Sequence, residues 1–265
     1  MKILFVGDIN GKPGRTCLEQ FLKKFKNNGL KYDFIVANVE NAAGGFGLSR
    51  DISNSLFKIG VGCQTSGNHI WDKKEIYSFF EDEPRLLRPA NYPSEAPGYG
   101  YNIYELDNDL NIAVINLQGR IFMWNIDCPF KTADRIIPEV AARAKIIIVD
   151  FHAEATSEKQ SLGRYLDGRV SAVIGTHTHV QTVDERILPG GTAFITDVGM
   201  TGPYDSIIGI EVEDALYRVI TCVPNRFTVA KGDVRFAAVE MEIDTETGKA
   251  ISIKRIFETS LETEE

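Results

Sequence analysis

The chain has few cysteines and few histidines, and it has no long apolar run. Its 265 residues include 4 cysteines and 4 histidines. The cysteines, at Cys17, Cys63, Cys128 and Cys222, are widely separated and form no Cys-x-x-Cys pair. A disulfide framework is therefore not expected. Reduced thiols are typical of a cytoplasmic protein, which is the location we predict.

Features that direct a chain to a membrane or to nucleic acid are also missing. The sequence enters a strand-like run at Lys2–Val6, without the charged region, apolar stretch and cleavage site of a signal peptide. No apolar run approaches the roughly 20 residues of a membrane-spanning helix, so we expect no membrane partner. A formal net charge of −8 argues against stable nucleic-acid binding, which relies on clustered Lys and Arg.

Strand-like and helix-like segments alternate through the first two thirds of the chain. Strands are expected at Lys2–Val6, Phe34–Asn38, Cys63–Thr65, Tyr101–Leu106, Ile112–Leu117, Ile146–Phe151, Ala172–Ile174, Thr192–Thr196, Phe227–Val229, Val234–Ile243 and Ala250–Phe257. Helices are expected around Leu18–Phe25 and Ile52–Ile59, and at Lys73–Phe80, Thr132–Ala144 and Glu158–Leu166. The order favours two mixed sheets packed face to face with helices outside, and a single doubly wound sheet is the alternative.

One α/β domain over residues 1–265 accounts for the length of the chain. A hydrophobic content of 43% is enough for one large core, and no linker or internal repeat interrupts the sequence.

All four histidines lie in short polar clusters that follow apolar runs, and two further apolar runs end on carboxylates. The five clusters are Gly7-Asp8, Asn38-Val39-Glu40-Asn41, Gly67-Asn68-His69, Asp150-Phe151-His152 and Gly175-Thr176-His177-Thr178-His179. Ligands of open α/β sheets gather beyond the carboxyl ends of the strands, where these clusters are expected. Their oxygen and nitrogen donors suit manganese, iron, zinc or cobalt. The pattern predicts a metal centre, although the spacing leaves open whether His177 and His179 serve one ion or two.

Longer motifs carry a resemblance to a known family. They are Asn38-Val39-Glu40-Asn41-Ala42-Ala43, Gly67-Asn68-His69-Ile70-Trp71-Asp72, Asp150-Phe151-His152-Ala153-Glu154-Ala155-Thr156 and Thr196-Asp197-Val198-Gly199-Met200-Thr201-Gly202-Pro203-Tyr204-Asp205. In this order they resemble the calcineurin-like metallophosphoesterases and, more closely, their YmdB-like branch. The resemblance extends from Gly7 to Asp205 and so covers most of the chain.

The resemblance implies a four-layer α/β/β/α sandwich with a dinuclear metal site and a homo-oligomeric assembly. One ion is assigned to Asp8, Glu40, Asn41 and His179, and the other to Glu40, Asn68, His152 and His177. Glu40 then bridges the two ions, and iron or manganese is favoured over zinc or cobalt. His69 is not a ligand in this assignment, because the corresponding family histidine donates a proton to the leaving oxygen.

The first motif departs from the wider superfamily. Many members have Asp-x-His there, whereas this chain has Asp8-Ile9-Asn10 and therefore lacks one imidazole ligand. We infer that the amide oxygen of Asn41 replaces it, with Asn10 as the rival candidate. The YmdB-like branch shares this departure, so it supports the narrower assignment.

The implied activity is the hydrolysis of 2′,3′-cyclic nucleotides, with 2′,3′-cAMP giving the 3′-monophosphate. Two metal ions would activate a hydroxide for in-line attack on a small phosphodiester. The alternatives are a phosphomonoesterase or phosphoprotein phosphatase, or a regulatory protein with weak residual hydrolase activity.

No residue that binds the substrate is assigned from the sequence. Trp71 and Tyr204 could stack on a nucleobase or simply pack, and Arg88 and Arg120 could meet phosphate or form surface contacts. The acidic segment Glu262–Glu265 is interpreted as a solvated tail.

Overall fold

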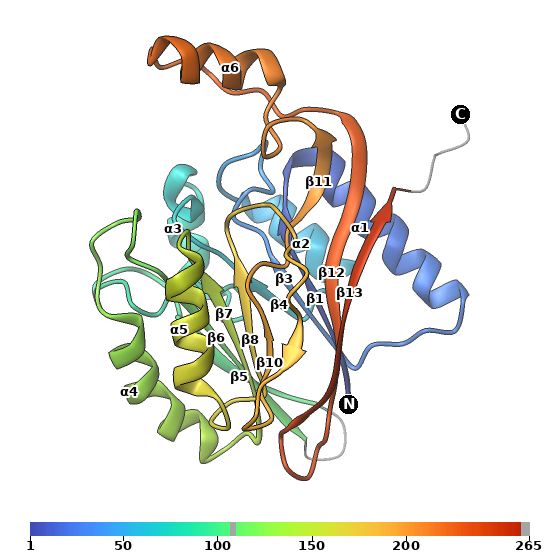
Figure 1. Cartoon of the computed structure of the whole chain (residues 1–265), viewed down its shortest axis with the longest axis vertical. Coiled ribbons are helices and arrows are strands. Elements are labelled where there is room, and N and C mark those ends of the chain that lie inside the picture. The colour runs from blue at the N-terminus through green and yellow to red at the C-terminus, as the bar shows by residue number, and fades with distance from the viewer. Residues whose placement is uncertain (107–109, 261–265) are drawn as a thin grey trace.

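The computed structural model describes residues 1–106 and 110–260 (Figure 1), so the acidic segment Glu262–Glu265 lies outside the described residues. The strands are β1 (Lys2–Val6), β2 (Asp8–Ile9), β3 (Phe34–Asn38), β4 (Cys63–Thr65), β5 (Tyr101–Glu105), β6 (Asn111–Gln118), β7 (Ile146–His152), β8 (Ala172–Thr176), β9 (Arg186–Ile187), β10 (Ala193–Ile195), β11 (Met200–Asp205), β12 (Gly232–Ile243) and β13 (Ala250–Thr259). The helices are α1 (Gly11–Asn27), α2 (Arg50–Lys58), the 3-10 turn η1 (Ile70–Asp72), α3 (Ile76–Asp82), α4 (Pro129–Ala141), α5 (Thr156–Leu166) and α6 (Val212–Thr221).

The described strands form two mixed sheets. In the first, the order is β2-β11-β12-β1-β3-β4, and β13 pairs with β12. Here β1 is parallel to β3 and antiparallel to β12. In the second, the order is β5-β6-β7-β8-β10-β9, with β6, β7, β8 and β10 parallel and β5 antiparallel to β6. The strands expected at Tyr101–Leu106 and Ile112–Leu117 are thus β5 and β6, and they pair with each other.

Alternation of side chains along the strands separates the layers of the sandwich. Leu4 of β1 packs in the apolar cluster that includes α1, whereas its neighbour Ile3 packs in the cluster between the sheets. In β7, Ile148 faces the cluster between the sheets and Ile147 faces the cluster that includes α4 and α5. Successive side chains of a strand point to opposite faces, so each sheet has one face on the other sheet and one on helices. The predicted α/β/β/α arrangement is confirmed.

Three local features differ from the predictions. The helix expected at Lys73–Phe80 is α3, which begins three residues later, at Ile76, and ends at Asp82. The strand expected at Phe227–Val229 contributes only an isolated bridge between Ile210 and Val229. Helix α6 was not predicted, and it projects from the body of the molecule (Figure 1), with Ala215 as its buried residue. Its apolar residues Val212, Ala215, Leu216 and Val219 recur at helical spacing, and the prediction missed this pattern.

Among the described residues, no helix combines the length and apolar character needed to cross a membrane.

Candidate metal centre

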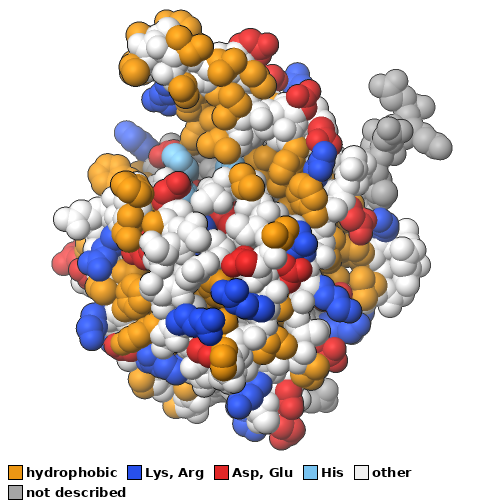
Figure 2. All heavy atoms as spheres, in the orientation of Figure 1, with side chains coloured by type: hydrophobic (Ala, Val, Ile, Leu, Met, Phe, Trp, Pro, Cys, Tyr) orange, Lys and Arg blue, Asp and Glu red, His pale blue; other side chains and the backbone are white. Residues whose placement is uncertain are grey.

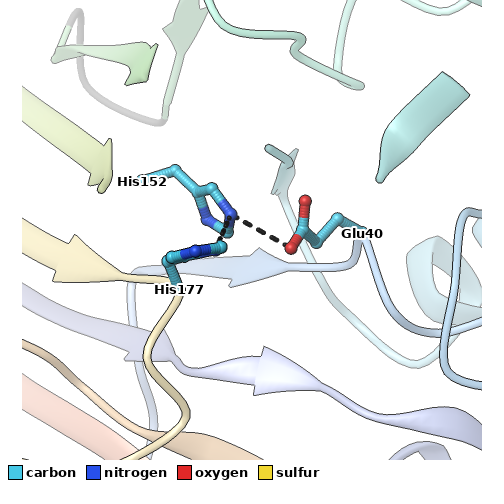
Figure 3. Close-up of side chains that lie close together, drawn as sticks. All are labelled: Glu40, His152 and His177. Atoms are coloured by element: carbon cyan, nitrogen blue, oxygen red, sulfur yellow. Dashed lines mark hydrogen bonds and ion pairs between the residues drawn. The ribbon is translucent and has the colours of Figure 1, made fainter. Parts of the chain in front are cut away.

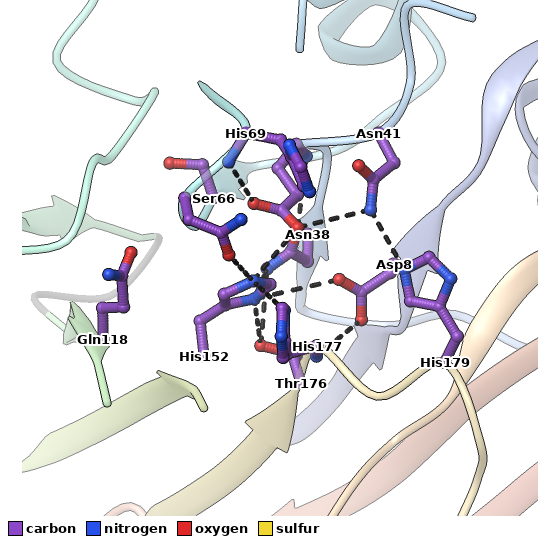
Figure 4. Close-up of polar contacts among 12 residues, drawn as sticks. Asp8, Asn38, Asn41, Ser66, His69, Gln118, His152, Thr176, His177 and His179 are labelled. Atoms are coloured by element: carbon purple, nitrogen blue, oxygen red, sulfur yellow. Dashed lines mark hydrogen bonds and ion pairs between the residues drawn. The ribbon is translucent and has the colours of Figure 1, made fainter. Parts of the chain in front are cut away.

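The polar clusters predicted at the strand ends meet at one edge of the two sheets (Figure 4). Glu40 follows β3 and Asn68 follows β4, both in the first sheet, whereas His152 ends β7 of the second sheet. The structure thus brings together all seven predicted ligands, which are Asp8, Glu40, Asn41, Asn68, His152, His177 and His179. The centre lies where the carboxyl ends of strands from both sheets open to the same side.

Three of the predicted ligands converge on one nitrogen atom of a fourth, Nε2 of His152. It lies 3.0 Å from Oε1 of Glu40 and 2.9 Å from Nδ1 of His177 (Figure 3). The amide oxygen of Asn68 lies 3.3 Å from the same nitrogen. The donor atoms of Glu40, His152 and His177 are all within 4.8 Å of one another, which is close enough to share a cation. These four residues are the set that the resemblance assigns to one ion.

The remaining predicted ligands lie next to this group and share Glu40 with it. The amide nitrogen of Asn41 lies 3.0 Å from Nε2 of His179 and 3.3 Å from Oε1 of Glu40. Asp8 accepts a hydrogen bond from the main-chain N–H of His177 at 3.3 Å. One carboxylate oxygen of Glu40 therefore contacts both groups, which is the position that a bridging ligand requires.

A hydrogen-bond chain determines which nitrogen of His152 faces the cluster. The hydroxyl of Thr176 donates to Asp150 at 2.7 Å, so its oxygen accepts from Nδ1 of His152 at 3.0 Å. With Nδ1 held by Thr176, Nε2 is the nitrogen that faces the other donors and is the one available to a cation. Metal-binding histidines are commonly oriented by such a partner on the second nitrogen.

The other two histidines of the cluster have the same arrangement. Nδ1 of His179 lies 2.8 Å from the main-chain carbonyl of Ile208, which can only accept, so Nε2 keeps its lone pair toward Asn41. Nε2 of His177 lies 3.2 Å from a carboxylate oxygen of Glu154, while Nδ1 faces His152. His177 and His179 thus each present an unprotonated nitrogen to the cluster. At His152, burial lowers the pKa but Glu40 outweighs it and raises the pKa to about 9, so a cation bound at Nε2 of His152 would replace the proton there.

The backbone that carries the last two histidines is strained and is held by a buried ion pair. His177 and His179 have positive φ angles of 102° and 65°, which are uncommon for residues with a side chain. Between them, the main-chain N–H of Thr178 donates to Asp197 at 3.0 Å, and Lys159 donates to the same carboxylate oxygen at 2.6 Å. Lys159 and Asp197 are each 1% exposed, so this pair anchors the loop from inside the protein.

Gly67 has a steric role at the centre. A Cβ atom at this position would lie 2.1 Å from Cδ2 of His152 and 2.5 Å from Oε2 of Glu40. These distances are far below contact distance, so any side chain at Gly67 would displace the two ligands. The glycine of the Gly67-Asn68-His69 motif therefore allows the close approach of two strand ends.

The donor set fits a cation. The oxygens Asp8 Oδ1, Asn10 Oδ1 and Asn41 Oδ1 are buried without a hydrogen-bond partner among the described residues, which is costly unless another group satisfies them. Burial raises the pKa of Asp8 well above its usual range, and Asp197 and Glu40 add to the rise although His152 opposes it. Burial and His152 lower the pKa of His177 to about 3, which keeps this imidazole neutral. A bound cation would compensate the buried carboxylates and use the free oxygens.

His69 lies beside the cluster rather than within it. Its main-chain N–H donates to Oε2 of Glu40 at 3.0 Å, and its Nδ1 lies 3.0 Å from Oδ2 of Asp72. The ring lines a cavity of about 250 Å³ together with Glu40, Asn41, His177 and His179. Figure 2 shows histidine at the surface in a recess beneath α6. The side chain of His69 is 34% exposed, so a ligand in this cavity can reach it.

Several partners of the site were missed at the level of sequence. Asp72, Glu154 and Asp197 lie inside the motifs quoted for the family, so their position in those motifs was the available signal. Lys159 carried no signal, because a lysine in a helix is usually exposed.

Of the four side chains considered for substrate binding, three make contacts within the protein and the fourth is exposed. The ring of Trp71 packs 5.3 Å from that of Phe80, and the hydroxyl of Tyr204 donates to the carbonyl of Met200 at 3.0 Å. The guanidinium of Arg88 donates to the carbonyls of Pro89, Ala96 and Pro97 and so closes the proline-rich loop. Arg120 is exposed.

The chain is similar to known proteins along almost its whole length. Residues 4–256 match the family described as YmdB-like protein. A Bacillus subtilis (strain 168) protein named 2′,3′-cyclic-nucleotide 2′-phosphodiesterase is 53% identical over 257 residues, which is 97% of each chain. A crystal structure of a hypothetical protein from Thermus thermophilus has a TM-score of 0.92 and 42% identity, covering 98% of this chain and 100% of that one. A crystal structure of a novel phosphatase from Mycoplasma pneumoniae has a TM-score of 0.91 and 34% identity, and the match covers 98% of this chain and 93% of that one.

Proposed function

The chain belongs to the YmdB-like family, and we propose that it is a metal-dependent phosphodiesterase that hydrolyses 2′,3′-cyclic nucleotides to 3′-monophosphates. One observation carries the proposal: donors from Glu40, Asn68 and His177 converge on Nε2 of His152, beside a cavity that His69 lines. The activity of the Bacillus subtilis relative supports the substrate class.

We assign two ions to the centre. One is held by Asp8, Glu40, Asn41 and His179, and the other by Glu40, Asn68, His152 and His177. The mixture of carboxylate, amide and imidazole donors without a thiolate favours iron or manganese. When bound, the two ions would lower the pKa of water and offset the negative charge on the phosphate oxygens.

His69 supplies the proton in this proposal. Ring opening breaks the bond between phosphorus and O2′, the oxygen of water adds to phosphorus, and O2′ needs a proton to leave as a hydroxyl. Because Asp72 engages Nδ1 of His69, Nε2 is the nitrogen that can donate to O2′. The imidazole lines the cavity without belonging to the ligand set, which suits an acid rather than a ligand.

The test is to measure metal content and 2′,3′-cAMP hydrolysis for the wild type, His69→Ala and His177→Ala. We expect two ions per chain and turnover in the wild type. His69→Ala should keep both ions and lose about 10²- to 10⁴-fold in kcat, the usual contribution of a general acid. His177→Ala should lose metal and turnover together.

Three results would contradict the proposal. They are a wild type that binds no transition metal, a wild type that prefers a phosphomonoester to the cyclic diester, and full turnover by His69→Ala.

A further inference from the structure

Two phenylalanines form an apolar wall on the side of the cavity where His69 lies. Phe46 and Phe227 line the same cavity as His69, His177 and His179. The ring centroid of Phe46 is 5.0 Å from that of His69 with the planes 72° apart, and it is 6.2 Å from that of Phe227 with the planes 20° apart. We call Phe46 and Phe227 the aromatic wall.

The local sequence holds Phe46 at the cavity rather than in the core. It lies in the segment Gly44-Gly45-Phe46-Gly47, whose glycines have positive φ angles of 74°, 93° and 74°. A Cβ atom at Gly45 would lie 2.9 Å from Val229, and one at Gly47 would lie 2.8 Å from Lys73. Only glycine accommodates this tight loop without strain, and the loop leaves the ring half-buried beside the cavity.

Phe227 is held from outside by the projecting helix. The guanidinium of Arg218 on α6 lies 4.6 Å from the ring centroid of Phe227, a cation–π contact. Helix α6 therefore contributes to the cavity although most of its own surface is exposed. Ile210 and Val229 add further apolar lining to the same cavity. A phosphate group alone would not need such a surface, whereas an aromatic ring bound beside the phosphate would.

The covalent structure of the substrate links this wall to the choice of bond. In a 2′,3′-cyclic nucleotide the base is attached to C1′, which is bonded to C2′, while C3′ is one carbon further away. Of the two ester oxygens bonded to phosphorus, O2′ is therefore the nearer to the base. A base held against Phe46 lies next to His69, because the two rings are in contact, and this arrangement brings O2′ rather than O3′ to the imidazole.

We propose that the aromatic wall binds the nucleobase and thereby selects the bond between phosphorus and O2′ for cleavage, an inference that rests on the proposed function. Water adds one hydroxyl to phosphorus and one proton to O2′, so the product is the 3′-monophosphate. If the base is not held, the cyclic phosphate can also bind with O3′ rather than O2′ toward His69. The proton is then delivered to O3′, and the product is the 2′-monophosphate.

The test compares products and binding for Phe46→Ala, Phe227→Ala and the conservative variant Phe46→Tyr. Chromatography separates 3′-AMP from 2′-AMP after hydrolysis of 2′,3′-cAMP. Each alanine variant should raise KM by about 5- to 150-fold, the range for losing one base–aromatic stack, and should increase the share of 2′-AMP. Phe46→Tyr should restore both values. Calorimetric binding of 3′-AMP should weaken in parallel, which gives a readout independent of turnover.

Phe122→Ala is the matched control. Phe122 is 90% exposed and lines a neighbouring pocket with Asn68 and His177. We expect this variant to keep the KM and the product ratio of the wild type. Wild-type turnover with unchanged KM and product ratio in both alanine variants would overturn the inference while leaving the proposed function intact. A change in Phe122→Ala alone would assign the base to the other pocket and also overturn it. A wild type without turnover would instead contradict the proposed function.

Discussion

Nδ1 of His69 lies 3.0 Å from Oδ2 of Asp72, three residues further along the chain. The contact is made within the turn η1, which begins directly after His69 and ends at Asp72. A carboxylate can only accept here, so the proton stays on Nδ1 and the second nitrogen, Nε2, is free to exchange a proton with a ligand in the cavity. Asp72 thus orients the proposed acid without contacting the substrate.

Replacement of Asp72 by asparagine should impair proton transfer but leave the metal in place. An amide can donate to Nδ1 and so favour the wrong tautomer of His69. Because the pair is partly exposed, we expect a fall of about 10- to 100-fold in kcat, less than for a fully buried triad carboxylate. The measurements are kcat against pH on 2′,3′-cAMP and metal content. The control is Asp82→Asn, a surface residue 3.9 Å from Arg50, which should behave as the wild type. Full turnover by Asp72→Asn would contradict this role.

The sequence was sufficient to predict that the polar residues of the metal centre gather at one edge, because strand ends are readable and parallel strands align their carboxyl ends, whereas the assignment of each ligand came from the family resemblance. Apolar runs ending at Asn38 and His152 located two of these edges, and the structure places both in one centre. The partners that orient the histidines were not readable in the same way. The carbonyl of Ile208 reaches His179 across 29 residues, and a main-chain carbonyl leaves no mark on a sequence.

Helix α6 was missed although its sequence shows the pattern: Val212, Ala215, Leu216 and Val219 recur at helical spacing. What depends on tertiary structure is that the helix projects from the body of the molecule, with Ala215 as its buried residue. Phe46 lies in a glycine-rich segment, and only the fold puts its ring against His69. The homo-oligomeric state and the cytoplasmic location stay predictions.

The two asparagines that compete for the first ion can be separated by metal content. Both Asn41 Oδ1 and Asn10 Oδ1 are buried without a partner among the described residues, but the amide of Asn41 also contacts His179 and Glu40. We expect Asn41→Ala to bind one ion per chain and Asn10→Ala to bind two, as measured by elemental analysis of the purified proteins. The opposite pattern would assign the ligand to Asn10.

Removal of the metal should destabilise the protein. The carboxylates of Asp8 and Glu40 are fully buried, and without a cation their charges repel each other. A ligand at 100 times its Kd stabilises the folded state by about 2.7 kcal/mol. Chelation should therefore lower Tm by several degrees, given about 2–4 °C per kcal/mol for domains approaching this size. Added manganese or iron should restore Tm. The same chelator should change Tm little in His177→Ala, and an unchanged wild-type Tm would argue against a bound metal.

Lys159→Met should destabilise the protein most at neutral pH. Nζ of Lys159 lies 2.6 Å from Asp197 in a pair with both side chains 1% exposed, and breaking a buried pair costs about 3–5 kcal/mol. Burial favours the protonated form of Asp197, but Lys159 and the N–H groups of Thr178 and Gly199 lower its pKa below 3.8. The stability that this carboxylate contributes is therefore present above pH 3.8 and is lost as the pH falls through the lowered pKa.

Without Lys159, burial dominates and the folded state favours protonated Asp197, so the deficit of Lys159→Met should shrink as the pH falls from 7 toward 3.8. Urea unfolding of the wild type and of Lys159→Met across this pH range measures the difference between their free energies of unfolding. The control is Lys24→Met, which removes a surface pair with Glu258 at 2.7 Å and should cost at most about 1 kcal/mol. Because Asp197 also holds Thr178 between two ligands, Lys159→Met should bind metal more weakly as well. If Lys159→Met and Lys24→Met lost the same free energy of unfolding, or if the loss in Lys159→Met did not depend on pH, the buried pair would not anchor this loop.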